Sequence, residues 1–136
     1  MTGLPGRLSI SSVDITTGDR AFEREDARVG TRDDLRRYLP LTESTYYIML
    51  ALSRPLHGYA VMQRVAELSR RSVTVGPGTL YGAFVTLEKQ KLIEKVGEEG
   101  RRKVYTLTAL GNRVLAAHTE RLRTMTRAGS EARGRR

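Results

Sequence analysis

The sequence predicts a mainly α-helical domain that carries one small β-hairpin, and three observations support this prediction. A helix start is marked by Gly76-Pro77, because proline fits the first helical position with its fixed φ angle and missing N–H. The helix must face a core along one stripe, since its apolar side chains follow at helical spacing: Leu80, Ala83, Phe84 and Leu87. Two strands come next, one starting at Leu92 and one ending at Leu107, with a charged turn at residues 98–100.

An earlier helix begins near Pro40, where order is expected to start. Thr42 can act as its N-cap, and Glu43 places an anion in the first turn, where the helix dipole favours negative charge. The helix ends before Pro55, because a residue that precedes proline is pushed out of the α region. The segment 55–58 is therefore expected to be a turn.

A second helix is expected from His57 or Gly58 to Arg70, with apolar residues at helical spacing. His57 is assigned a structural role at the start of this helix. The β-branched run at 73–75 predicts a short strand before the helix that starts at Gly76. The resulting order of three helices and then two strands is that of a winged helix-turn-helix.

Thr108 is expected to cap a last helix that runs from Ala109 towards Arg127. Its apolar stripe is too long for so small a domain to bury, so a second subunit is the natural cover and a homodimer is expected. His118 interrupts this seam, where either a place at the dimer interface or an exposed one is possible. The predicted dimerisation residues are Leu110, Val114, Leu115, Leu122 and Met125.

The domain organisation follows from these elements. Residues 1–38 have balanced charge and no sustained periodicity, which favours a disordered arm, although a non-native leader or a later translation start explains them equally well. A short helix capped by Thr31 and ending at Leu39 is a weaker expectation. The winged helix-turn-helix then covers 39–108, the dimerisation helix 109–128 and a basic tail 129–136.

The composition favours a polyanionic partner, since the formal net charge is +9 and the pI is about 10.5. The chain has no cysteine, and its two histidines lack a partner at metal-ligand spacing, so neither metal nor cofactor is expected. Glu98 and Glu99 are adjacent loop carboxylates without a nucleophile or base, so no catalytic residue and no enzyme activity is expected. The absence of an apolar run of about 20 residues argues against a membrane protein, and the absence of a secretory core favours the cytoplasm.

Two groups of residues are candidates for contact with DNA. The face of the third helix opposite its apolar stripe carries small or hydroxylated groups that suit close approach to a groove: Thr79, Tyr81, Gly82, Thr86 and Lys89. Tyr81 has an alternative role, with its ring packed inward and only its hydroxyl exposed. The second group is the cationic run Arg101, Arg102 and Lys103, of which strand alternation sends Arg102 to one face and its neighbours to the other.

With these residues in place, the chain resembles the PadR family of transcriptional regulators. The resemblance covers residues 40 to about 125 and is carried chiefly by Gly78-Thr79-Leu80-Tyr81-Gly82, the basic run 100–103 and Leu107-Thr108, with His57-Gly58-Tyr59 as a weaker part. It implies a dimeric winged-helix repressor of the compact subfamily, with one C-terminal dimerisation helix, that binds a pseudo-palindromic double-stranded DNA operator. It also implies a small hydrophobic or phenolic effector held near the dimer interface. The chain lacks tryptophan, which argues against the aromatic-stacking pocket of some relatives.

Two other functions compete with this interpretation. A winged helix can serve as a protein-interaction module, but such modules generally lose the basic wing that this sequence keeps. Non-specific binding of nucleic acid, including RNA, usually relies on exposed aromatic platforms, which two phenylalanines and no tryptophan scarcely provide.

Overall fold

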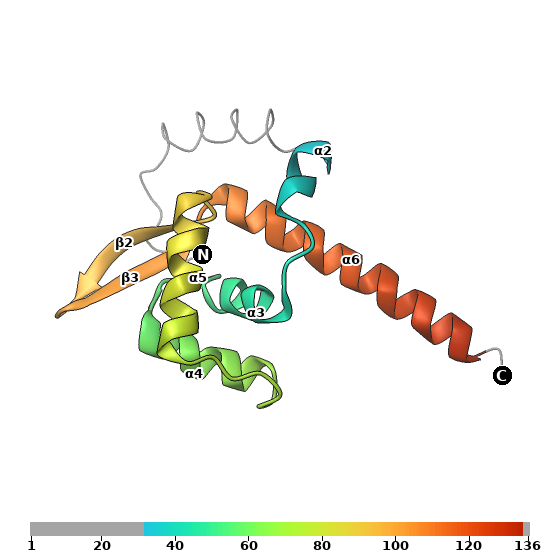
Figure 1. Ribbon diagram of the computed structural model, residues 1–136, viewed down its shortest axis with the longest axis horizontal. Helices are drawn as coiled ribbons and strands as arrows, with labels where there is room; N and C mark the ends of the chain where they lie inside the picture. Colours follow the sequence, from blue (N-terminus) through green and yellow to red (C-terminus); the bar gives the residue numbers. More distant parts are fainter. Residues whose placement is uncertain (1–31, 135–136) are drawn as a thin grey trace, which may run out of the picture. The chain divides into compact units, whose positions relative to one another are not determined.

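The computed structural model of the protein describes residues 32–134 (Figure 1). The chain divides into two units, 1–34 and 35–136, and the described structure belongs almost entirely to the second. Helices and one small antiparallel sheet make up this second unit, which confirms the predicted fold class. The predicted arm at 1–38 lies outside the described residues as far as residue 31, and so does the proposed cap at Thr31.

Packing begins at Leu35, a few residues before the expected start near Pro40. Leu35 ends the short helix α2 (Arg32–Leu35) and is 7% exposed, and the 3-10 turn η1 (Arg36–Tyr38) follows it. The next helix is α3 (Glu43–Ala51). Its predicted cap is confirmed, because the Thr42 hydroxyl accepts a hydrogen bond from the Thr45 amide at 3.1 Å.

The prediction of a simple turn at 55–58 was wrong, because Leu56–His57 forms strand β1. It pairs antiparallel with β3 (Arg102–Leu107), so that Leu56 lies opposite Tyr105. The sheet order is β1-β3-β2. A strand of two residues has too little sequence to show a period of two, and it forms here because β3 offers it an unpaired edge.

Helix α4 (Gly58–Leu68) and helix α5 (Pro77–Lys89) form the expected helix-turn-helix pair. The strand predicted at 73–75 is absent: Val73 and Val75 are buried at 8% exposure within an irregular turn. The Ser69 hydroxyl donates to the carbonyl of Val73 at 3.1 Å and accepts from its amide at 3.0 Å. Burial of the two valines therefore explains their β-branched character without a strand.

The hairpin is formed by β2 (Ile93–Glu99) and β3, as predicted. Gly100 turns the chain with a φ angle of 62°, a conformation that glycine adopts without steric cost. A register shift between Lys95 and Gly97 leaves Val96 50% exposed.

Helix α6 spans Ala109–Gly134, well past the expected end near Arg127 (Figure 1). Its predicted cap is confirmed, because the Thr108 hydroxyl accepts from the Gly111 amide at 2.9 Å. That hydroxyl also donates to the carbonyl of Lys91 at 2.7 Å, which ties the start of α6 to the end of α5. The segment 129–134, predicted as part of a basic tail, continues the helix.

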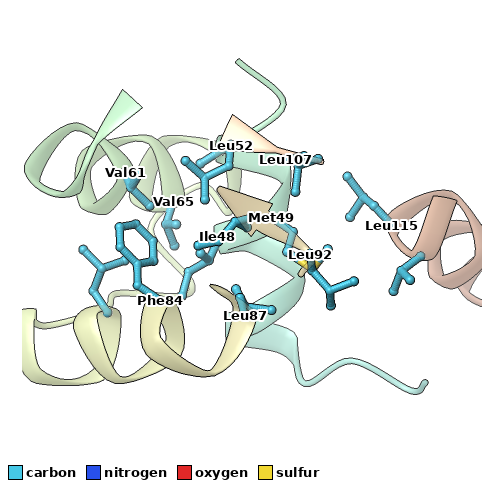
Figure 2. Packing of buried hydrophobic residues seen from close by; sticks show 14 of the residues in the cluster. Ile48, Met49, Leu52, Val61, Val65, Phe84, Leu87, Leu92, Leu107 and Leu115 are labelled. Carbon is cyan, nitrogen blue, oxygen red and sulfur yellow. The ribbon is translucent and has the colours of Figure 1, made fainter. Parts of the chain in front are cut away.

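One hydrophobic core joins these elements (Figure 2). Helix α3 and its C-cap contribute Ile48, Met49 and Leu52, none of which has exposed surface. Side chains from α4, α5, the sheet and the first turns of α6 converge on them, as Figure 2 shows for Val61, Phe84, Leu92, Leu107 and Leu115. The core thereby fixes α5 and the hairpin, whose remaining faces point to solvent.

Candidate nucleic-acid interface

Helix α5 has an inner and an outer face, as its sequence predicts. Leu80, Phe84 and Leu87 are buried with 0–3% exposure, so the helix is anchored along one stripe. Four predicted site residues are exposed and lie at spacings of three and four residues along the outer face: Thr79, Gly82, Thr86 and Lys89. The outer face of α5, defined by these four residues, is small, hydroxylated and cationic at its C-terminal end.

Tyr81 does not belong to this outer face. Its ring is 52% exposed and meets Phe84 edge-on at 5.9 Å between centroids. Its hydroxyl oxygen lies against α4, at 2.5 Å from where a Cβ on Gly58 would stand. The inward-ring alternative is therefore wrong, since the ring is exposed and the hydroxyl is the part that rests on the protein.

The hairpin, here called the wing, carries its cations where the sequence placed them. Arg101 lies in the turn and Arg102 and Lys103 begin β3, and all three side chains are exposed. The wing also holds glutamates: Lys95 pairs with Glu98 at 2.9 Å. The hydrogen bond and charge of Lys95 and the charge of Lys103 hold the pKa of the Glu98 carboxyl below its ordinary value. Arg101 and Lys103 form no ion pair within the described part of the chain.

His57 connects the wing to α4. Its Nδ1 accepts a hydrogen bond from the Ala60 amide at 3.3 Å and so caps α4, which bears out the structural role predicted for it. A neutral imidazole that accepts at Nδ1 carries its proton on Nε2. That nitrogen lies 3.3 Å from Nη1 of Arg102, which is itself a donor, and 3.8 Å from Oε1 of Glu99, a distance that allows electrostatic attraction but no hydrogen bond.

A groove of about 460 Å³ runs between the N-terminal end of α4, helix α5 and the wing. This wing groove is defined by the residues that line it: His57, Gly58, Tyr59, Tyr81, Phe84, Val85, Glu88, Arg101, Arg102, Lys103 and Tyr105. Its α5 wall is a second helical stripe, since Tyr81, Phe84, Val85 and Glu88 follow at intervals of three, four and seven residues. Tyr81 and the wing cations therefore share one concave surface, which the outer face of α5 borders.

Seven of the eleven residues that line the wing groove were not predicted as site residues, and three of these seven give the groove apolar surface. Tyr59 and Val85 are 55% and 65% exposed, and Tyr105 lies half-buried with its ring 4.8 Å from that of Phe84. Burial, and secondarily the charge of Glu88, raises the pKa of the Tyr105 phenol. An apolar Val85 on the polar side of α5 was the one signal that the sequence offered.

The predicted dimerisation residues fall into two groups. Val114 and Leu115 are buried in this chain's own core with 0% and 7% exposure, and Leu110 packs against that core. Leu122 is half-buried and Met125 is 65% exposed. Only the latter two lie on the part of α6 that extends beyond the core, so any contact with a partner there depends on them.

His118 is buried rather than exposed, with 7% of its surface accessible. Its Nδ1 accepts from the Leu41 amide at 3.2 Å, and its ring lies 5.1 Å from that of Tyr46. Among residues 32–134 no helix is long and apolar enough to cross a membrane. The same part of the chain contains no cluster of three or more potential metal ligands.

The fold, with a helix-turn-helix pair followed by a cationic hairpin, defines a winged-helix protein of the DNA-binding class. Residues 48–117 match the transcriptional regulator PadR-like family, and the chain belongs to that family. Its members are regulators of transcription rather than enzymes.

Individual proteins are similar to parts of this chain. A 37.1 kDa uncharacterized protein in transposon TN4556 of Streptomyces fradiae is 39% identical over 61 residues, which are 45% of this chain but only 17% of that protein. Uncharacterized protein X of Lysinibacillus sphaericus is 33% identical over 73 residues, or 51% of this chain and 67% of that one. A PadR family transcription regulator from Clostridium difficile shares the fold with a TM-score of 0.57 at 25% identity, over 64% of this chain and 94% of that chain.

Proposed function

We propose that the protein is a homodimeric repressor that binds a pseudo-palindromic DNA operator in a sequence-specific way and is released by a small hydrophobic effector. The observation that carries the proposal is the outer face of α5, which is exposed, small and hydroxylated and stands beside a cationic wing. The formal charge of +9 adds attraction for a polyanion.

Helix α5 is the recognition element in this proposal. The major groove of DNA is about 12 Å wide and admits one α-helix, and side chains as small as Thr79, Gly82 and Thr86 allow the backbone of α5 to come close. Threonine hydroxyls can donate to and accept from base edges. Lys89, at the C-terminal end of the helix, can pair with a phosphate or a guanine.

The wing supplies contacts to the DNA backbone. Arg101 and Lys103 are exposed and form no ion pair within residues 32–134, so their charged groups are accessible to phosphates. Each neutralised phosphate lowers log K by about 0.9 per unit of log salt concentration. Two such contacts per subunit therefore predict a measurable salt slope, to which α5 adds.

Dimerisation would place two α5 helices on one face of the DNA. Half-sites bound by such a dimer are separated by one helical turn, about 34–36 Å. Leu122 and Met125 on the protruding part of α6 support this arrangement, because the core of this chain does not cover them. Repression then follows from occupation of a promoter by the dimer.

The test is binding of the full chain to the DNA upstream of its own gene and to an unrelated duplex, each titrated with salt. The proposal expects a preference of about 10³ or more for the upstream DNA and a steep negative salt slope. Equal, purely salt-governed affinity for promoter duplexes across the genome would refute sequence-specific recognition. Absence of binding to any duplex would favour the protein-interaction module.

Matched variants sharpen this test. Thr79→Ala and Lys89→Ala should weaken operator binding more than binding to bulk DNA, since the outer face of α5 reads the sequence. Ser53→Ala and Arg54→Ala remove the same kinds of group from an exposed site outside both candidate surfaces and should leave the preference unchanged. Equal effects of the two pairs would contradict the assignment of α5.

A further inference from the structure

The turn after α4 holds two arginines in an unfavourable backbone conformation. Arg70 and Arg71 have φ angles of 53° and 68°, in the left-handed region that glycine adopts without steric cost. The Arg71 amide donates to the Ala66 carbonyl at 2.8 Å. The Arg70 amide donates to the Glu67 carbonyl at 3.1 Å, which completes a helix end of the Schellman type. Glycine is usual in such a turn, so the backbone gives no reason for arginine there.

Stability does not explain the two side chains either. A helix end attracts cations through its dipole, but this attraction is weak at an exposed site and smaller than the steric cost of two left-handed residues. Both side chains are exposed, and neither forms an ion pair within residues 32–134. Strained residues of this kind concentrate at functional sites, which indicates a role for the guanidinium groups in binding.

The two arginines border a depression on the solvent side of α4. One hollow of about 470 Å³ lies at the C-terminal end of the helix, and a second of about 260 Å³ lies nearer its N-terminal end. Both are lined by Gln63 and Glu67, so they form one continuous surface. This surface shares no residue with the wing groove or the outer face of α5. We call it the outer face of α4 and define it by its polar residues: Arg54, Gln63, Arg64, Glu67, Arg70 and Arg71.

Positive charge dominates the outer face of α4. Its four arginines face a single carboxylate, that of Glu67, which pairs with Arg64 at 3.1 Å. Arg54 at one end and the arginine pair at the other form no ion pair in the described part of the chain. Each end can therefore bind a carboxylate through a guanidinium group, which suits that geometry.

The centre of this face favours a peptide over a DNA backbone. Its floor contains the half-buried Leu56, Ala60 and Ala66, which offer apolar surface that a row of phosphates does not use. Phosphates are uniformly negative and would be repelled by Glu67, whereas a peptide N–H can donate to that carboxylate. Helix α4 has 11 residues and is about 16 Å long, the length of about five extended residues.

We propose that the outer face of α4 binds an acidic segment of another protein, with carboxylates on Arg54 at one end and on Arg70 and Arg71 at the other. The site goes beyond the proposed function and does not depend on it. Because the face is separate from the surfaces assigned to DNA, the protein can hold the acidic segment and the operator at the same time.

Fluorescence anisotropy of the full chain with a labelled peptide tests the site. The probe is about ten residues of aspartate, glutamate, alanine and leucine, long enough to span the face when extended. Its control is the same peptide with asparagine and glutamine in place of the acids. At about 0.15 M salt, where exposed charges are screened beyond about 8 Å, the acidic peptide should bind at least tenfold more tightly. Equal affinities would overturn the proposal.

Two double variants locate the peptide. Arg70→Gln with Arg71→Gln should lower its affinity at least tenfold and leave DNA binding unchanged. Arg101→Gln with Lys103→Gln removes two cations from the wing and should do the reverse. Equal loss of peptide binding in both would show unspecific attraction to cations and refute the site. Loss of DNA affinity in the first variant would assign the face to DNA, and its loss of self-association in sedimentation would assign the face to a second copy of the chain.

Glycine variants separate binding from folding. Arg70→Gly with Arg71→Gly removes both charges and relieves the turn, so the melting temperature should rise while peptide affinity falls. Peptide binding that persists in this folded variant would contradict the proposal. Failure of the parent protein to bind any DNA would sink the proposed function, while the peptide titration would still decide this site.

Discussion

Gly111 sets the approach of α6 to the rest of the fold. A Cβ at this position would overlap the carbonyl oxygen of Leu92 and stand 3.3 Å from Cδ2 of Leu107. The same Leu92 carbonyl accepts a hydrogen bond from the Thr108 amide at 3.0 Å, so it cannot retreat without loss of that bond. The close contact between α6 and the start of β2 therefore requires glycine.

We expect Gly111→Ala to lower the free energy of unfolding by about 1–3 kcal/mol, because overpacking outweighs the gain in helix propensity. Gly129→Ala is the matched control, since it lies on the same helix with nothing within 4 Å of an added Cβ. That change should be neutral or stabilise by up to about 1 kcal/mol. Urea denaturation of both variants decides the matter, and the same sign for both would refute the packing argument.

His118 makes stability depend on pH. Burial, and secondarily the nearby charge of Arg121, lowers the pKa of its imidazole in the folded state. The unfolded chain takes up a proton near the ordinary pKa of about 6.5, while the folded chain stays neutral to lower pH. Stability is therefore full above that value and falls as the pH drops towards the lowered pKa.

This dependence can be assigned with two asparagine variants. His118→Asn keeps an acceptor for the Leu41 amide but does not titrate, so the decline in melting temperature between pH 7 and pH 5 should flatten. His57→Asn is the natural control, because the other histidine also accepts a backbone amide through Nδ1. If only His57→Asn flattened the decline in melting temperature, the assignment of the pH dependence to His118 would be refuted.

At the scale of elements, helix α5 is stopped by an unfavourable conformation. Lys91 follows the helix with a φ angle of 66°, and the Leu92 amide donates back to the Leu87 carbonyl at 2.9 Å. Glycine is the usual residue at this position after a helix, because other residues have a steric cost in the left-handed region.

Lys91→Gly should therefore stabilise the protein, by about 0.5–1 kcal/mol in thermal or urea unfolding. Lys89→Gly removes the same side chain two residues earlier, where the backbone is helical. Glycine inside a helix costs about 1 kcal/mol relative to alanine, so this control should destabilise. Destabilisation by both variants would show that the Lys91 side chain itself contributes.

The elements that could be predicted are those whose sequence carries a period or a cap. Thr42 predicts the start of α3, and Gly76-Pro77 predicts the start of α5. Both helices begin at these residues. Strand β1 could not be predicted, because two residues exist as a strand only through their partner β3. Val73 and Val75 led to the prediction of a strand that is absent. Their β-branched side chains are explained by burial in the core and not by a strand.

The candidate site also has parts that the sequence predicts and a part that it does not. The outer face of α5 and the wing cations follow from helical spacing and from composition. The wing groove does not, since it depends on the distance between α5 and β3 and on the room that Gly58 leaves for Tyr81. Such distances arise from tertiary packing, which no single segment of the sequence encodes.

At the scale of the whole molecule, α6 belongs to the core for only part of its length. Gly111, Leu115 and His118 are buried, and Leu122 and Met125 continue the same stripe at helical spacing beyond the core. Fourteen of the sixteen residues from Thr119 to Gly134 are exposed. A long helix of this kind is marginal in water without a partner for its apolar side.

Met125→Glu should therefore convert a dimer into a monomer, because it places a charge at the more exposed of the two seam residues that the core does not cover. Ala116→Glu adds the same charge to an exposed position on the opposite side of α6 and should leave the dimer intact. Sedimentation equilibrium of the two variants and the parent chain measures the difference, with helix content checked by circular dichroism. A monomer should also lose most of its affinity for a two-half-site operator, since each subunit then binds alone. A Met125→Glu protein that remains dimeric would move the interface away from α6, and the spacing of the two α5 helices on DNA would need another origin.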